Sequence, residues 1–105
     1  LTREEVRAWF AKRVQRTPEA YDYYGVAKNF YQIGAFSRAI LCLQEYVETT
    51  GATSAGRHLL AYSLLNTGQK TRALQEFRRC AQDGSPDDWQ LVVELTIELA
   101  AETNP

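Results

Sequence analysis

Reactive side chains are scarce in this chain of 105 residues. It holds a single histidine, His58, and two cysteines, Cys42 and Cys80. No Cys, Ser or carboxylate stands at a spacing from His58 that suggests a catalytic triad. A zinc site needs about four N or S ligands, which this chain can hardly supply. The sequence therefore predicts no enzyme active site, no metal site and no cofactor.

The cysteines and the carboxylates near the end of the chain have simple structural explanations. Both cysteines lie in apolar helical patterns and do not form a C-x-x-C motif. Buried free thiols are favoured over a disulfide, which suits a reducing compartment. Glu94, Glu98 and Glu102 step by four residues along one helical face. A solvated face explains these three better than acid–base catalysis does.

Composition and charge narrow the function classes. The chain is 45% hydrophobic and 24% charged, as in ordinary globular proteins. No apolar run approaches the ~20 residues that span a bilayer, so no membrane insertion is expected. Residues 83–105 carry six acidic side chains and no Lys or Arg, although the net charge is only −1. A basic body with an acidic end is not typical of a dedicated nucleic-acid binder.

Apolar residues recur at helical spacing along the whole chain, and no strand is expected. Gly34 and Gly68 are predicted to close two helices as left-handed terminal residues. The fold class is therefore all-α, with about six helices. The predicted helices cover about residues 3–15, 18–33, 36–48, 54–67 and 70–82, and a last stretch that opens at Ser85-Pro86.

Capping signals mark three helix starts. Thr2 with Glu5 three residues later predicts a capping box. Thr17 is predicted to cap the second helix because a proline follows it, and Ser85 to cap the last helix for the same reason. The first helix is expected to turn one stripe inward, formed by Val6, Trp9, Phe10 and Val14.

Two segments repeat one pattern 34 residues apart. A helix-turn-helix unit with this period is typical of the tetratricopeptide repeat, TPR. Its small residues let two helices approach closely, and a large residue fills their crossing. The alternative is a generic helical bundle. The matching pairs are Ala27 and Ala61, Gly34 and Gly68, Arg38 and Arg72, Ala39 and Ala73, and Leu43 and Phe77.

The repeat predicts a TPR-type helix-turn-helix solenoid that forms a single domain over residues 1–105. An extra N-terminal helix occupies 1–17. The first TPR unit covers 20–53 and the second covers 54–87. Residues 88–103 match only the first helix of a third unit, and they would cover the open end of the second unit as a capping helix.

A row of side chains on the first helix of each unit forms a candidate binding groove, because these helices normally line the concave surface of a TPR solenoid. The predicted groove residues are Tyr24, Lys28 and Tyr31 in the first unit, and His58 and Tyr62 in the second. Aromatic residues beside a cation suit an extended peptide and tolerate a stacked base. The alternative is that some of these tyrosines belong to the core.

The order of the segments resembles one TPR family in particular. "VRAWFAKRVQRTPEA" is followed by "YYGVAKNFYQIGAFSRAILCLQEYVET", then by "GRHLLAYSLLNTGQKTRALQEFRR", and "DDWQLVVELTIELAAE" closes the run. This order is similar to that of the amino-terminal TPR domain of the giant Ran-binding nucleoporins of the cytoplasmic pore filaments. The resemblance extends over about residues 5–102.

The resemblance implies a non-catalytic interaction module that helps anchor a nucleoporin at the cytoplasmic face of the nuclear pore. It would bind other nuclear-pore proteins and support the transport of protein and mRNA. Two alternatives stay open, namely an adaptor for an extended peptide and a weak binder of single-stranded RNA. RNA binding would use a basic surface, and weak self-association is expected from the apolar stacking faces. The basic surface residues are Arg57, Lys70, Arg72, Arg78 and Arg79.

Overall fold

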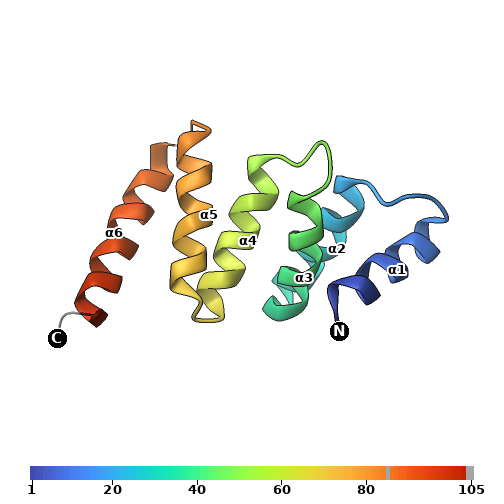
Figure 1. Cartoon of the computed structure of the whole chain (residues 1–105), viewed down its shortest axis with the longest axis horizontal. Helices are drawn as coiled ribbons and strands as arrows, with labels where there is room; N and C mark the ends of the chain where they lie inside the picture. Colours follow the sequence, from blue (N-terminus) through green and yellow to red (C-terminus); the bar gives the residue numbers. More distant parts are fainter. Residues whose placement is uncertain (85, 104–105) are drawn as a thin grey trace.

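The computed structural model describes residues 1–84 and 86–103 and contains six α-helices in these ranges (Figure 1). No residue in the described ranges forms a strand, so the predicted all-α class is confirmed. The helices are α1 (Arg3–Val14), α2 (Ala20–Gln32), α3 (Phe36–Val47), α4 (Ser54–Asn66), α5 (Lys70–Gln82) and α6 (Pro86–Thr103).

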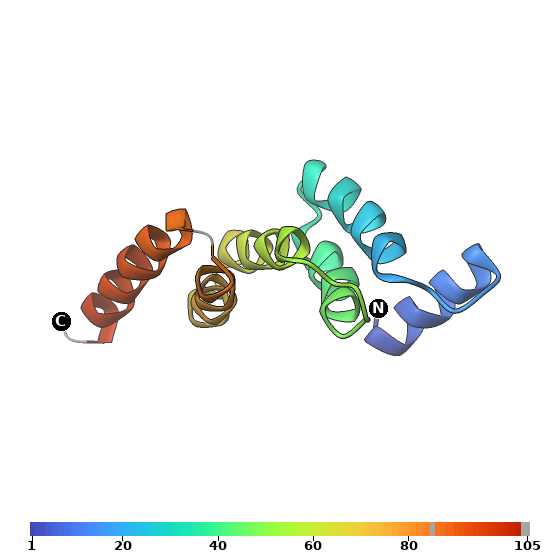
Figure 2. The same cartoon turned by 90° about the horizontal axis from the view of Figure 1, so that it is seen from above.

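The helices stand side by side in an elongated row that measures 51 × 28 × 21 Å (Figure 1). α2 packs against α3, and α4 packs against α5. α3 also contacts α4, and α5 contacts α6, while α1 lies against α3 near one end of the row. Seen from above, α2 and α4 lie on one side of the row and α3 and α5 on the other (Figure 2). This is a repeat-like helical fold that is compatible with a solenoid.

The α2–α3 and α4–α5 turns have the same backbone geometry. The φ angle is 79° at Gly34 and 80° at Gly68, a left-handed conformation that residues with a Cβ rarely adopt. The next amide in each turn bonds to a carbonyl five residues back, which satisfies an otherwise free helix-end group. Both predictions of a closing glycine are confirmed. The bonds run from Ala35 N to Phe30 O at 2.8 Å and from Gln69 N to Leu64 O at 2.9 Å.

The same positions are buried at both helix crossings. Three pairs of residues that lie 34 apart in the sequence have 0% exposure. The alanines let the helix backbones approach. Leu43 in the first unit and Phe77 in the second fill the space between the helices. The period in the sequence is therefore also a period in the packing. The three pairs are Ala27 and Ala61, Ala39 and Ala73, and Leu43 and Phe77.

The start of α2 differs from the prediction. α2 begins at Ala20, and its N-cap is Glu19 rather than Thr17. The Glu19 amide donates to Asp22 Oδ2 at 2.7 Å, and the same carboxylate binds Arg16 Nη1 at 2.7 Å. The prediction of Thr17 as the N-cap is wrong, because the Asp22 carboxylate organises the first turn around the residue three positions before it.

The other two predicted caps have different outcomes. The capping box is confirmed, since the Glu5 amide donates to Thr2 Oγ1 at 3.1 Å and the Thr2 amide donates to Glu5 Oε1 at 3.3 Å. α6 begins at Pro86, in agreement with the predicted start. Ser85, its predicted N-cap, lies outside the described residues.

The buried stripe of α1 is narrower than predicted. Val6 and Phe10 are buried, but Trp9 is 50% exposed. The Trp9 ring meets the ring of Phe10 edge-on at 5.0 Å, and the guanidinium of Arg13 lies 5.2 Å from its centroid. Among the described helices α1 packs mainly against α3, so the row covers one narrow stripe of it. The prediction that Trp9 faces inward is wrong.

Candidate functional site

α2 places its three predicted groove residues at different depths. Lys28 is exposed, whereas Tyr24 and Tyr31 are half-buried and pack against the core. The Tyr24 ring lies 5.8 Å from the ring of Tyr46, and the Tyr31 ring lies 5.3 Å from that of Phe36, both measured between centroids. Both tyrosines therefore help to build the core and offer only part of their surface to a ligand.

Tyr62 is the exposed aromatic residue of the predicted groove on α4. Its ring meets Phe77 edge-on, with the centroids 5.1 Å apart. Burial of part of its side chain raises the pKa of Tyr62, and the nearby groups of Asp88 and Tyr31 raise it further. α2 also contacts α4, so the helices that carry Tyr31 and Tyr62 are neighbours.

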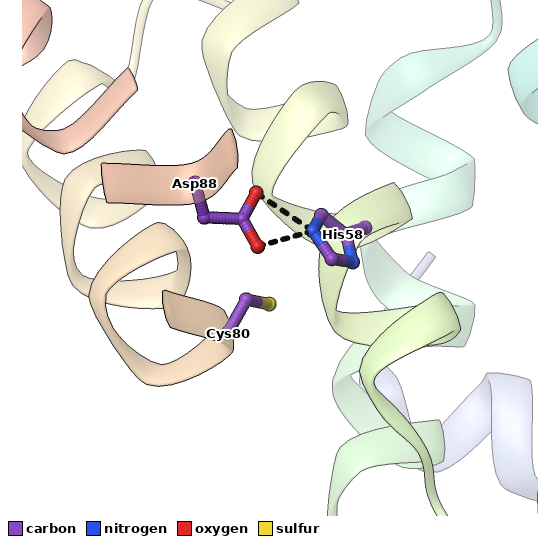
Figure 3. A group of neighbouring side chains, drawn as sticks. All are labelled: His58, Cys80 and Asp88. Carbon is purple, nitrogen blue, oxygen red and sulfur yellow. Dashed lines mark hydrogen bonds and ion pairs between the residues drawn. The ribbon is translucent and has the colours of Figure 1, made fainter. Parts of the chain in front are cut away.

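His58, the remaining groove residue, is already engaged with another helix (Figure 3). Its Nε2 lies 2.7 Å from Asp88 Oδ1 and 2.6 Å from Asp88 Oδ2, and its Nδ1 lies 2.9 Å from Ser54 O. Asp88, in the first turn of α6, is only 3% exposed. The thiol of Cys80, on α5, points into the same space. The ligand atoms of His58, Cys80 and Asp88 all lie within 4.8 Å of one another.

The hydrogen bonds of His58 determine where its protons lie. The Ser54 carbonyl can only accept, so Nδ1–H of His58 donates to it. In the neutral ring Nε2 then carries a lone pair, and this lone pair faces the two oxygens of Asp88. Such a contact between acceptors is repulsive unless a proton or a metal ion lies between them.

The cluster is not arranged for nucleophilic catalysis. Cys80 is fully buried, and burial raises the pKa of its thiol to about 11, with smaller contributions from nearby charges. The thiolate form that a nucleophile needs is therefore disfavoured at neutral pH. In a triad one ring nitrogen is held by a carboxylate and the other faces the nucleophile. Here Asp88 holds Nε2 and the Ser54 carbonyl holds Nδ1, so neither nitrogen is left to accept the proton of the Cys80 thiol. Imidazole, thiol and carboxylate groups that converge in this way can instead hold a metal ion.

Sequence reasoning missed this cluster because its members come from three different helices. The sequence predicts His58 as a groove residue and Cys80 as a buried free thiol, and Asp88 lies in the segment predicted to form the last helix. The one signal that could have brought them together is the repeat itself. α4 and α6 occupy equivalent positions in successive units, so side chains from their first turns lie near each other.

The predicted basic surface is partly neutralised by carboxylates. Arg72 and Arg78 are exposed. Cations that already have a carboxylate partner gain less by binding phosphate, so the geometry gives RNA binding little support. Three of the five predicted residues are ion-paired in the described part of the chain: Arg57 with Glu76 at 3.6 Å, Arg79 with Glu76 at 3.1 Å, and Lys70 with Glu102 at 2.6 Å.

An apolar stripe on α6 was not singled out from the sequence. It consists of Trp89, Val93 and Ile97, which are 49%, 55% and 64% exposed. Their spacing of four residues places them along one side of the helix. Exposed apolar residues that are grouped in this way are typical of an interaction surface.

Comparisons with protein-family models, with curated proteins and with solved structures find no match to this chain. Among the described helices, none combines the length and the apolar character needed to cross a lipid bilayer. Function is therefore inferred from the residues and the geometry of the chain itself.

Proposed function

We propose that the chain is a TPR-type protein-interaction module without catalytic activity. The observation that carries this proposal is the repeated helix pair. α2–α3 and α4–α5 share a left-handed glycine turn and the same buried crossing residues at a 34-residue period. Stacked helix pairs of this kind present extended surfaces that bind other proteins.

Within this class, we propose that the module belongs to a nucleoporin. The support is the resemblance of its ordered segments to the amino-terminal TPR domain of the giant Ran-binding nucleoporins. In this role it helps anchor its protein at the cytoplasmic face of the nuclear pore and supports the transport of protein and mRNA. The α6 stripe of Trp89, Val93 and Ile97 is the contact surface for another pore protein, because burial of these side chains would stabilise the complex.

Localisation in cells tests this proposal. The protein with a fluorescent tag is expected to form a rim at the nuclear envelope that coincides with a pore scaffold protein. Ile97→Asp should abolish the rim, because it places a charge in the stripe. Gln90→Asp is the matched control, since Gln90 is an exposed polar residue of the same helix. A diffuse distribution of the unaltered protein would count against the nucleoporin role.

A second candidate function follows from the contact between α2 and α4, the helices that carry the predicted groove residues. In this function Tyr31 and Tyr62, each with part of its side chain accessible, would contact an extended peptide together with Lys28, which is exposed on α2. An immobilised peptide library is expected to retain the folded domain. Lys28→Glu combined with Tyr62→Ala should abolish retention, whereas Lys12→Glu, an exposed lysine on α1, should not. Unchanged retention of the double variant would contradict this function.

A further inference from the structure

Three helices meet at one buried corner of the row. The first turn of α6 reaches the first turns of α4 and the last turn of α5 there, and brings Asp88 to His58 and Cys80 (Figure 3). Nε2, Sγ and a carboxylate oxygen lie within 4.8 Å of one another. In the described ranges, no other three His, Cys, Asp or Glu side chains converge in this way.

The orientation of His58 prepares its Nε2 for a cation. Nδ1–H donates to Ser54 O at 2.9 Å, which fixes the ring and leaves Nε2 as the nitrogen that can release a proton and bind a metal ion. A backbone carbonyl is a usual partner for the second nitrogen of a metal-binding histidine. Nε2 faces the Asp88 oxygens at 2.6 and 2.7 Å, so an imidazole nitrogen and a carboxylate converge on one point.

Zinc would require small shifts of the three ligand atoms, which lie within 4.8 Å of one another. Zinc binds nitrogen and oxygen at ~2.0–2.2 Å and sulfur at ~2.3 Å, so tetrahedral ligand atoms stand roughly 3.3–3.7 Å apart. The Asp88 carboxylate would move back from Nε2 by about 0.7 Å to admit the ion. His58 is half-buried, so a water molecule can reach a fourth position from the outside.

We propose that His58, Cys80 and Asp88 together bind one zinc ion, with water as the fourth ligand. A mixed N, S and O ligand set suits zinc and related transition metals, whereas calcium and magnesium prefer oxygen ligands alone. The count of N and S ligands in the sequence missed this site, because it left out a carboxylate contributed by another helix. The ion joins α4, α5 and α6 and fixes the end helix to the row.

Binding changes the protons at the site but requires no redox step. Cys80 binds as the thiolate, so its thiol proton leaves to solvent when the zinc–sulfur bond forms. A proton held between Nε2 and Asp88 leaves in the same way. Without metal, the corner keeps its imidazole–carboxylate contact. This proposal does not depend on the function proposed above.

Substitution by cobalt(II) tests the site. The whole chain, reduced and stripped with a chelator, is expected to bind one Co²⁺ with visible bands of tetrahedral geometry and a near-ultraviolet thiolate-to-cobalt band. Added zinc should remove both absorptions. Cys80→Ser should lose the thiolate band. Cys42→Ser is the matched control, because Cys42 is a buried free cysteine outside the cluster, and it should keep the full spectrum.

Thermal unfolding is the second readout. Zinc that binds only the folded state, at about a hundredfold above its Kd, should raise Tm by about 10 °C in the unaltered chain and in Cys42→Ser. His58→Gln and Cys80→Ser should show no rise. If Cys80→Ser does not fold, the unaltered chain is compared with His58→Gln alone, because His58 is only half-buried. The proposal is overturned if the unaltered chain shows no thiolate band and no rise in Tm, or if Cys42→Ser loses both.

Discussion

The aromatic ring of Tyr46, near the end of α3, lies against Gly56 in the first turn of α4. A Cβ at position 56 would stand 2.0 Å from Cε1 of that ring. The Tyr46 hydroxyl also accepts a hydrogen bond from the amide of Thr53, the N-cap of α4, at 2.7 Å. Tyr46 therefore determines both where α4 begins and how closely it approaches α3, and so it connects the two repeated helix pairs.

Alanine substitution should have opposite effects at two helical glycines. Gly56→Ala is expected to destabilise the fold by ~1–3 kcal/mol, because overpacking against Tyr46 outweighs the gain in helix propensity. Gly25→Ala should stabilise it by ~0.5–1 kcal/mol, because helix propensity favours alanine. No atom lies within 4 Å of a Cβ built on Gly25. Urea unfolding measures the change in the free energy of unfolding for both variants. Equal changes, of the same sign, would rule out a close contact between Tyr46 and Gly56.

A buried carboxylate connects α1 to α3. Glu45 is buried, and it binds Arg3 Nε at 2.9 Å and Arg7 Nη1 at 3.4 Å. Arg3→Ala with Arg7→Ala should destabilise the fold by about 2 kcal/mol, because it leaves a buried charge unpaired, although the exposure of both arginines limits the loss. Glu45→Met should cost less, since both arginines can then turn to water. Chemical denaturation compares the variants, and a larger loss for Glu45→Met would contradict this account.

Stability should fall in acid because of two carboxylates bound by arginine. A hydrogen bond from Arg3 lowers the pKa of Glu48, and one from Arg16 lowers the pKa of Asp22. A lowered folded-state pKa adds stability above the unfolded-state value of ~4, and that stability is lost as pH falls through the folded value.

Thermal melts between pH 7 and pH 2 check this prediction. The unaltered chain should lose Tm below about pH 4. Arg3→Ala with Arg16→Ala should start from a lower Tm at pH 7 and lose less of it on acidification. If the plots of Tm against pH were parallel for the two proteins, these ion pairs would not link stability to pH.

The thiol of Cys42 should react slowly. Burial raises its pKa to about 11, so about one molecule in a thousand carries the thiolate at pH 8. In the Cys80→Ser variant, where Cys42 is the only thiol, alkylation by iodoacetamide should accelerate about tenfold per pH unit from pH 7 to 9. In urea, the alkylation rate of the same variant should bend near pH 8.5, the ordinary pKa of a free thiol, and level off above it. A bend of the alkylation rate near pH 8.5 in the folded protein would contradict the raised pKa.

The helices and their repeated pairing could be read from the sequence, because the responsible interactions are local or periodic. Gly34 and Gly68 act within their own turns, since only the φ of one residue is involved. Ala27, Ala61 and the other matched residues recur at the period of the packing unit. The failure at Thr17 is also local, because two competing caps lay within three residues and the Asp22 carboxylate selected Glu19.

Only the tertiary structure decided which side chains meet across helices and which stay exposed. His58 and Asp88 are 30 residues apart in the sequence and yet in contact, and Tyr46 lies on Gly56 across a loop. Trp9 and Ile97 have the spacing of buried residues, but they lie on the two end helices of the row, where no other helix of the described residues covers them. Helical periodicity identifies an apolar face but not the neighbour that covers it. The proposed contact surface and the proposed metal site therefore emerge only from how the helices stack.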